Sequence, residues 1–310
     1  MPAIASGKVL VTGANGFIAG WIVKALLENG FSVRGTVRSA KKVEALKALF
    51  PDHAARLEFA VVEDIARDGA FDDAIKGVDA IVHTASPIDL TLHDPEAFVG
   101  PAARGTTGIL RSMQAHDPTV KRIITISSVG AVCSLTDYPS GEGKPKAAWK
   151  IYNDEKERGT IGWDFVTLGP PWVFGPALGA EAPEELGLSV GYWFQHTIKQ
   201  SKLYPDSMKA WVVVSSWIDV RDVATAVRLS LTKEAAEGER FIVASIHSGA
   251  LISIVSRLLG QADSAEQSRD IVFEYAFDAK KSREVLGISY KGKEETAAYI
   301  LDDFKAKGWL

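Results

Sequence analysis

Residues 8–19, with the sequence KVLVTGANGFIA, constrain the fold more than any other segment of the chain. An apolar run ends in two spaced glycines, and an amphipathic pattern typical of a helix begins directly after them. This order predicts a β-strand, a tight turn and a helix N-terminus. Gly13 supplies the backbone freedom that the turn needs, and Gly16 lets a pyrophosphate approach the main chain. Free amides at the start of a helix bind such an anion, so the segment indicates a dinucleotide site. Glycines that serve packing alone are the alternative.

Basic residues follow the second predicted strand, residues 31–38, where a dinucleotide-binding unit meets the adenosine ribose. An acidic residue at this position selects the free 2′-hydroxyl of NAD, whereas an arginine accommodates the 2′-phosphate of NADP. The strand ends in Arg38, and Lys42 stands one helical turn further on. A guanidinium can hold a phosphate through two hydrogen bonds, and a lysine adds a point charge. We therefore expect NADP(H) as the cofactor; a solvated basic helix start is the alternative.

Whole-chain composition indicates a cytoplasmic enzyme with no nucleic-acid partner and no membrane partner. The 310 residues carry a net charge of −4 and the basic residues are scattered, so no basic field for nucleic acid is expected. One cysteine, Cys133, excludes an intrachain disulfide and fits a reducing compartment. The N-terminal segment is too short for a signal peptide, and no apolar run reaches the ~18 residues of a membrane span. We expect no metal site, and either a monomer or a homodimer.

Strand and helix patterns alternate through the first half of the chain, which predicts the α/β class. Apolar strands that are each followed by a helix form a parallel sheet buried on both faces. The further predicted strands are 57–65, 79–86, 121–128, 163–171 and 211–219, and the helices are 95–116, one from 220 and one at 294–305. We predict a Rossmann-type doubly wound sheet in residues 1–176, with elements returning from the C-terminal half. Residues 177–310 are predicted to form mainly a smaller substrate lobe.

Short motifs along the whole chain resemble, in order, those of the extended short-chain dehydrogenase/reductases of the NAD-dependent epimerase/dehydratase superfamily. The resemblance is to the dihydroflavonol-reductase and cinnamoyl-CoA-reductase branch, particularly the fungal NADPH-dependent aldehyde and ketone reductases. The matching segments are VTGANGFI from Val11, VRGTVRS from Val33, VEDI from Val62, VHTASP from Val82, TISS from Thr125, LGPPWVFGP from Leu168, WIDVRDVA from Trp217 and KSREVLG from Lys281. One departure is Ala19, where many relatives have a third glycine; alanine is small enough for close helix packing.

The resemblance implies cofactor contacts at the carboxyl ends of the strands, where an open parallel sheet forms its ligand crevice. By similarity, Asp64 and Ile65 would hold the adenine. Thr84, Ala85 and Ser86 would line the nicotinamide ribose, and the segment from Pro170 to Val173 would position the carboxamide. The implied set is Gly13, Asn15, Gly16, Phe17, Ile18, Arg38, Lys42, Asp64, Ile65, Thr84, Ala85, Ser86, Pro170 and Val173. A helix cap is the structural alternative for Asp64.

The catalytic residues that the resemblance implies are a serine, a tyrosine and a lysine. The serine holds the carbonyl oxygen, the tyrosine donates a proton, and the lysine one turn later lowers the pKa of the tyrosine. Ser128 matches the serine, and the one Tyr-x-x-x-Lys of the sequence is Tyr152 with Lys156. Only 18 residues lead from Tyr152 to Pro170, and they must hold a helix end, a turn and a strand. We therefore expect Tyr152 to be an ordinary helix residue and keep Tyr152 and Lys156 only as weak catalytic candidates.

A missing segment would explain this spacing. Residues 146–150, KAAWK, resemble the family sequence that follows the catalytic lysine by about two turns, whereas residues 138–144, YPSGEGK, resemble the loop that precedes the tyrosine. Their junction at Lys144 and Pro145 skips the stretch that would hold Tyr-x-x-x-Lys. We infer an internal deletion there and expect a shortened helix over residues 146–158, with Pro145 in its first turn.

Two classes of function remain open. One is NADPH-dependent reduction of an aldehyde or ketone to an alcohol, acting on a small carbonyl compound and impaired by loss of the Tyr-x-x-x-Lys segment. The other is a non-catalytic NADP(H)-binding or sensor protein with the same fold. A sugar-nucleotide epimerase or dehydratase is a weaker third, because Arg38 stands where binding of NAD would favour an acid.

Overall fold

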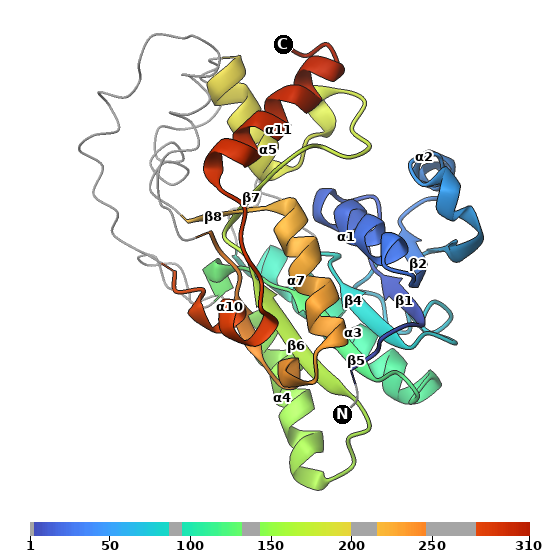
Figure 1. Ribbon diagram of the computed structural model, residues 1–310. Coiled ribbons are helices and arrows are strands. Elements are labelled where there is room, and N and C mark those ends of the chain that lie inside the picture. Colours follow the sequence, from blue (N-terminus) through green and yellow to red (C-terminus); the bar gives the residue numbers. More distant parts are fainter. Residues whose placement is uncertain (1–2, 87–94, 132–142, 200–215, 246–276) are drawn as a thin grey trace. The chain divides into compact units, whose positions relative to one another are not determined.

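The computed structural model describes residues 3–86, 95–131, 143–199, 216–245 and 277–310 (Figure 1). The chain forms two compact units. The first comprises Met1–Gly169 and Ala224–Phe241, and the second comprises Pro170–Val223 and Ile242–Leu310. The first unit therefore takes its last elements from the C-terminal half of the chain. Within the described ranges, no helix combines the length and hydrophobicity that a membrane span requires.

A seven-stranded sheet forms the centre of the first unit, in the order β3-β2-β1-β4-β5-β6-β9. Its strands are β1 (Lys8–Val11), β2 (Ser32–Val37), β3 (Leu57–Val61), β4 (Ala80–His83), β5 (Arg122–Ile126), β6 (Asp164–Gly169) and β9 (Arg240–Ile242). Neighbouring strands from β3 across to β6 pair in parallel. The strand order reverses beside β1, and such a point opens a ligand crevice at the carboxyl ends of the strands. The predicted Rossmann-type doubly wound fold is confirmed.

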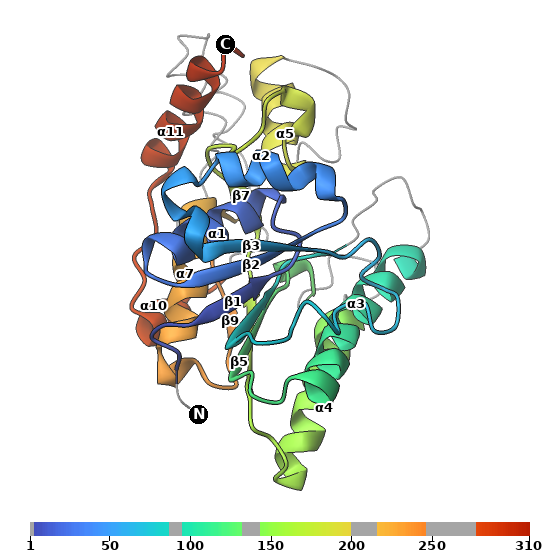
Figure 2. The ribbon, with the colours of Figure 1, turned by 90° about the vertical axis from the view of Figure 1, so that its right-hand side faces the viewer.

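Helices cover both faces of this sheet (Figure 2). One face carries α1 (Phe17–Glu28) and the part of α7 (Val220–Thr232) that belongs to the first unit, and the other carries α3 (Pro95–His116) and α4 (Gly143–Arg158). The shorter elements of the unit are α2 (Val43–Ala48) and 3₁₀ turns at Ala40–Lys42, Pro51–Arg56, Val129–Ala131 and Glu234–Ala236. The apolar residues of α1 recur on one side and are buried there, as an amphipathic helix on a sheet requires.

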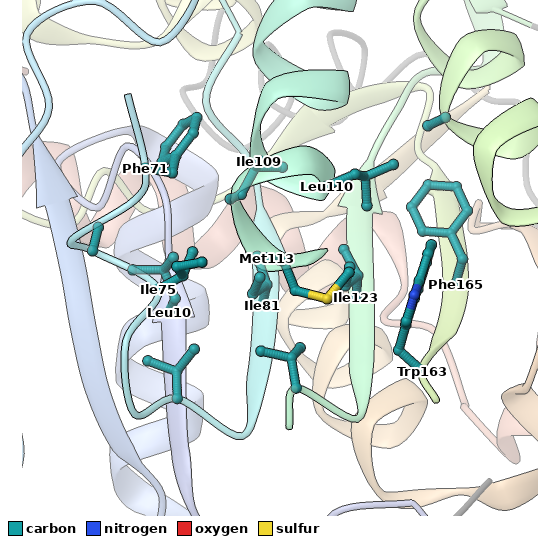
Figure 3. Packing of buried hydrophobic residues seen from close by; sticks show 14 of the residues in the cluster. Leu10, Phe71, Ile75, Ile81, Ile109, Leu110, Met113, Ile123, Trp163 and Phe165 are labelled. Atoms are coloured by element: carbon teal, nitrogen blue, oxygen red, sulfur yellow. The ribbon is translucent and has the colours of Figure 1, made fainter. Parts of the chain in front are cut away.

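The core between the sheet and α3 is a row of side chains from adjacent strands. Leu10 pairs with Ile81, Ile81 with Ile123, and Ile123 with Phe165, so all four point to the same face. Three buried residues of α3 pack onto this row: Ile109, Leu110 and Met113 (Figure 3). Each fully buried side chain of this size contributes about 1.5–3 kcal/mol. This row therefore holds α3 across the middle of the sheet.

The elements differ from their predicted bounds mainly at their ends. The helix over Pro95–His116 has the predicted limits, and α4 ends at Arg158 as expected but begins at Gly143 instead of residue 146. Pro145 still lies in its first turn, where a missing N–H needs no partner within the helix. The strands are shorter than the apolar runs, because residues at both ends of most runs, such as Asp79 and Thr84, lie outside the strand. Residues 211–215 of one predicted strand lie outside the described ranges.

The second unit contains a two-stranded parallel ladder of β7 (Trp172–Phe174) with β8 (Trp217–Asp219). Its helical elements are α5 (Leu188–Trp193), α10 (Lys280–Leu286), α11 (Lys293–Ala306), a 3₁₀ turn at Pro183–Glu185 and a π-helical turn at Phe194–Ile198. Asp219 pairs with Arg221 at 2.6 Å and accepts a hydrogen bond of 2.7 Å from the Thr296 hydroxyl, which joins β8 to α11. Burial raises the pKa of the neighbouring Asp222 to about 6.

A buried ion pair joins the amino ends of β5 and β6 to the end of α7. The Arg122 and Asp164 side chains are 0% exposed, and the guanidinium meets both carboxylate oxygens at 2.6–2.9 Å. Arg122 also donates to the Ser230 carbonyl at 2.5 Å and to the Lys233 carbonyl at 2.7 Å. The last carbonyls of a helix lack partners within the helix, so one arginine satisfies both the carboxylate and a helix end.

Replacing Asp164 by Asn should destabilise the protein by about 3–5 kcal/mol, because the substitution leaves the buried Arg122 charge uncompensated. Asp154→Asn is the matched control, since Asp154 forms an exposed pair with Lys150 on α4, and such pairs contribute about 0–1 kcal/mol. Denaturant unfolding of the two variants measures both losses. Equal losses would show that the Arg122 ion pair does not hold the sheet together.

Candidate functional site

The turn after β1 has the geometry that the sequence predicts for a dinucleotide site. Gly13 has φ +65°, in the left-handed region that favours glycine. Its amide donates to the Thr36 hydroxyl at 3.0 Å, and the Gly16 amide donates to the Gly13 carbonyl at 2.8 Å. A Cβ on Gly13 would lie 3.3 Å from the Cβ of Ala85, at the carboxyl end of β4. The turn therefore lies directly beside the end of β4, at the switch point of the sheet.

The N-terminus of α1 offers backbone donors to an anion. Gly16 caps the helix with extended backbone and no side-chain hydrogen bond, and the first turn contains no acidic residue. Asn15 and Gly16 are exposed, while Phe17 and Ile18 are half-buried. The first amides of a helix have no partner within it and face the positive end of the helix dipole. These residues fit a dinucleotide pyrophosphate, for which the backbone of Gly13 and Gly16 leaves room.

The Thr12 hydroxyl ties this turn to the end of β4. Its oxygen lies 3.0 Å from the amide nitrogens of Thr84 and Ala85 and 3.0 Å from Nδ1 of His83. The Thr84 hydroxyl in turn donates to the Thr12 carbonyl. Thr12 is fully buried, and Ser86 follows as a half-buried residue. Two of the segments that the sequence assigns to the cofactor are thus held together by a single hydroxyl.

Arg38 and Lys42 lie where the sequence predicts the 2′-phosphate contact, directly after β2. The Ser39 hydroxyl accepts from the Lys41 amide and starts the 3₁₀ turn that carries Lys42. Arg38, Lys41 and Lys42 are exposed. Among the described residues, Arg38 forms no ion pair with a carboxylate. Its guanidinium is thus available to an anionic ligand at this end of the sheet.

Asp64 and Ile65 follow β3 in an irregular segment. The Asp64 carboxylate is exposed and accepts a hydrogen bond of 2.8 Å from the Ala66 amide, which closes a local turn. Ile65 packs against α3, where a Cβ on Gly105 would lie 2.9 Å from its Cδ1. Asp64 therefore closes a local turn, and since no helix begins at this described segment, the helix cap expected as the alternative for Asp64 is not formed.

Ser128 lies just beyond the carboxyl end of β5. It is exposed, and its Oγ accepts a hydrogen bond of 3.1 Å from the Gly130 amide, which starts the turn at Val129–Ala131. The preceding residue, Ser127, continues the ladder by donating its amide to the Leu168 carbonyl at 2.8 Å. A serine hydroxyl has one donor and two acceptor sites. Accepting from Gly130 therefore leaves the Ser128 proton for a ligand oxygen.

Tyr152 and Lys156 lie far from Ser128, at the amino edge of the same sheet. Tyr152 is 2% exposed, and its ring packs in T-shaped contacts on Trp149 and Trp163 with centroids 5.5 Å apart in both cases. A Cβ on Gly238, just before β9, would lie 3.2 Å from the Tyr152 hydroxyl and 3.9 Å from Lys156 Nζ. Burial raises the pKa of Tyr152 despite the nearby Lys156 charge. The phenol is therefore a core group with a weakened tendency to ionise.

The length of β5 gives the scale of this separation. Tyr152 lies beside Trp163 and near Gly238, which come shortly before β6 and β9, whereas Ser128 comes two residues after the last residue of β5. Five strand residues span about 13 Å at 3.3 Å per residue. A phenol at one edge of a sheet cannot reach a serine at the other edge by a change of rotamer.

The remaining two predicted contacts, Pro170 and Val173, belong to the second unit. Pro170 is buried directly after β6, and Val173 is buried in β7, where it pairs with Ile218. Sequence reasoning missed Thr12, Thr36 and His83 as parts of the site. Their signal was present, since each is a buried hydrogen-bonding residue within or directly after a strand that ends at the crevice.

Comparison with known proteins shows the family of the chain. A family model described as the NAD dependent epimerase/dehydratase family matches residues 9–244. The ketoreductase azaE of Aspergillus niger is 32% identical over 319 aligned positions, which take in 92% of this chain and 93% of that protein. Cinnamoyl-CoA reductase 1 of Petunia hybrida is 29% identical over 343 aligned positions, which take in 100% of this chain and 96% of that one.

A solved structure shows the same architecture. The yeast methylglyoxal/isovaleraldehyde reductase Gre2, complexed with NADPH, superposes with a TM-score of 0.78 at 25% identity. The match covers 98% of this chain and 100% of that one. Because the match covers nearly the whole of both chains, it includes the second unit as well as the sheet of the first unit.

Gly13→Ala should destabilise the protein more than Gly159→Ala. Both glycines have φ near +66° (+65° and +67°), but a Cβ at Gly159 would meet nothing within 4 Å, whereas at Gly13 it would press on Ala85. The shared left-handed backbone costs about 1–2 kcal/mol, and crowding at Gly13 should add about 1 kcal/mol or more. Thermal unfolding measures both, and the stabilisation by added NADPH should fall only for Gly13→Ala. A loss of that stabilisation in Gly159→Ala as well would contradict the assignment of the turn.

Proposed function

The chain belongs to the NAD dependent epimerase/dehydratase family and its cofactor is NADP(H), and we propose that it is an oxidoreductase that reduces an aldehyde or ketone slowly. The substrate would be a small carbonyl compound, bound with the help of the second unit as the substrate lobe. The single cysteine, Cys133, supports a location in the reducing cytoplasm.

In this proposal the first unit holds the cofactor along the carboxyl edge of its sheet. The amides of Gly16, Phe17 and Ile18 would bind the pyrophosphate, with Gly13 and Asn15 shaping the turn. Arg38 and Lys42 would bind the 2′-phosphate, and Asp64 with Ile65 would border the adenine. Thr84, Ala85 and Ser86 would line the nicotinamide ribose, while Pro170 and Val173 would contact the carboxamide. The open glycine turn beside Ala85 supports this arrangement.

Bound NADPH supplies the hydride, and the protein must supply the rest. Ser128 would donate a hydrogen bond to the carbonyl oxygen, since its hydroxyl is exposed at the carboxyl end of β5. The oxygen gains negative charge as the hydride arrives, so it also needs a proton donor within hydrogen-bond reach, roughly 3 Å. A serine hydroxyl with an ordinary pKa is a poor proton donor at neutral pH.

The observation that carries the proposal of a low rate is the position of Tyr152. The tyrosine of the one Tyr-x-x-x-Lys in the sequence is buried among tryptophans at the opposite edge of the sheet from Ser128. In the described part of the chain, no tyrosine–lysine pair lies beside Ser128. A chain without this donor can still bind NADP(H), so a non-catalytic NADP(H)-binding or sensor protein is the second candidate function.

The length of the aligned relatives supports a lost segment. The alignment with the Petunia hybrida reductase has 343 positions and uses all of this chain's 310 residues, so about 343 − 310 = 33 positions have no residue of this chain opposite them. We propose that most of these positions correspond to the stretch skipped at Lys144 and Pro145, which would carry the tyrosine and lysine of the relatives.

Arg38→Ala should remove most of the preference for NADPH over NADH, because the guanidinium is the main partner proposed for the 2′-phosphate. Wild-type protein should bind NADPH more tightly, by a margin that shrinks as salt screens the charges. Calorimetry with both cofactors measures the two affinities, and Arg158→Ala, exposed at the end of α4, is the control. Equal affinities of wild-type protein for NADPH and NADH would contradict the assignment.

Tyr152→Phe should leave the residual rate of NADPH-dependent reduction unchanged, because the phenol lies in the core away from Ser128. Inserting a family-like segment with Tyr-x-x-x-Lys between Lys144 and Lys146 should raise the rate by orders of magnitude, since a positioned acid contributes about 10²–10⁴-fold. NADPH oxidation with a panel of aldehydes and ketones measures both. A brisk wild-type rate that Tyr152→Phe abolishes would overturn the proposal, whereas no detectable rate together with tight NADPH binding would favour the sensor.

A further inference from the structure

We propose that His83 is a positioning residue of the cofactor site, and that it acts as a neutral imidazole with an unprotonated Nδ1 that orients the Thr12 hydroxyl. The proposal rests on the proposed function in one respect, which is that Thr84 and Ala85 contact the cofactor. His83 belongs to the VHTASP segment that begins at Val82, and the resemblance implies no cofactor contact for this histidine.

The hydrogen bonds around Thr12 determine which atom carries which proton. Three nitrogens lie 3.0 Å from its Oγ1: the amides of Thr84 and Ala85 and Nδ1 of His83. A backbone amide can only donate, so the two amides occupy both acceptor sites of the hydroxyl. The hydroxyl proton then has one direction left, toward Nδ1. Nδ1 must accept it, which makes the imidazole neutral with its proton on Nε2.

The surroundings of His83 suit a neutral ring. The residue is 0% exposed, and its ring stands at 87° to that of Phe71, with centroids 6.0 Å apart. His83 pairs in register with Thr125, and Thr125 pairs with Thr167. These residues form a polar layer two positions beyond the apolar row of Ile81, Ile123 and Phe165 seen in Figure 3. The side chains paired with His83 along this layer are neutral, so they give a buried imidazolium no counter-charge.

This arrangement fixes the distance between the glycine turn after β1 and the residues that follow β4, which are two parts of the proposed cofactor site. Thr12 precedes the glycine turn, whereas Thr84 and Ala85 follow β4. If the hydroxyl lost its acceptor at His83, its proton would have to turn toward an amide and one amide would lose its partner. The end of β4 would then move relative to Gly13, whose Cα hydrogen faces Ala85 closely. His83 thus sets the distance between the pyrophosphate turn and the nicotinamide-ribose segment.

Replacing His83 by Leu and, separately, by Asn tests whether the histidine positions the Thr12 hydroxyl or only fills its site in the core. Leu fills the site without an acceptor, whereas the Asn Oδ1 atom can take the place of Nδ1. We expect His83→Leu to weaken NADPH binding about tenfold and His83→Asn to restore most of it. Adenosine 2′,5′-bisphosphate lacks the nicotinamide half, so its affinity should be unchanged in both variants. Equal weakening in His83→Leu and His83→Asn, or parallel loss of the bisphosphate, would overturn the proposal.

Two further measurements test the hydrogen bond itself. In the double variant Thr12→Val/His83→Leu, the second substitution should cost no further affinity, because the bond is already gone; additive losses would contradict the coupling. His116→Leu, on the exposed end of α3, is the control for loss of a histidine. Long-range proton–nitrogen NMR of the cofactor-free protein should show His83, identified by its absence in His83→Asn, as the Nε2–H tautomer at pH 6. An imidazolium or an Nδ1–H tautomer would overturn the proposal even if NADPH binds, whereas failure of wild-type protein to bind NADPH would overturn only the proposed function.

Discussion

The buried pair of Arg122 and Asp164 is the interaction on which the first unit depends most. It joins two central strands at their first residues and holds the end of a helix that arrives from the other half of the chain. A guanidinium has five donors in a rigid plane, which is why one side chain can serve a carboxylate and several carbonyls at once. Because β5 and β6 are fixed in register here, the residues that follow them, including Ser128, are fixed at the opposite edge.

The amino and carboxyl edges of the sheet are therefore held by different kinds of interaction. The amino edge is closed by the ion pair and by the aromatic rings around Tyr152. The carboxyl edge is held by neutral hydroxyls, those of Thr12 and Thr36, and leaves backbone amides at the start of α1 without side-chain caps. Arg38 at that edge is exposed and forms no ion pair with a carboxylate among the described residues. Hydrogen bonds hold this edge rigid, yet the first amides of α1 remain available as donors. Binding of an anionic ligand requires both.

Sequence patterns could predict the sheet, the glycine turn and the helix over Pro95–His116, because these follow from local apolar periodicity and turn residues. The end of α4 at Arg158 was also predictable, because the 18 residues from Tyr152 to Pro170 must hold a helix end, a turn and a strand. The partners of Arg122 and of the Thr12 hydroxyl were not. Arg122 stands in an otherwise apolar strand, and its partners lie 42 and 108 residues away. No local pattern encodes contacts that exist only once distant segments have packed.

The first unit is assembled from two stretches of chain that are separated by residues 170–223. During synthesis, residues 1–169 leave the ribosome before α7 and β9 exist. At that stage Arg122 can meet Asp164 but lacks the carbonyls of Ser230 and Lys233, and the Thr167 amide at the outer edge of β6 lacks its partner at Glu239. An unpaired strand edge next to an uncovered apolar face is prone to association with other chains. Until residue 241 has emerged, the nascent protein therefore exposes a strand edge and an apolar face that the complete first unit covers.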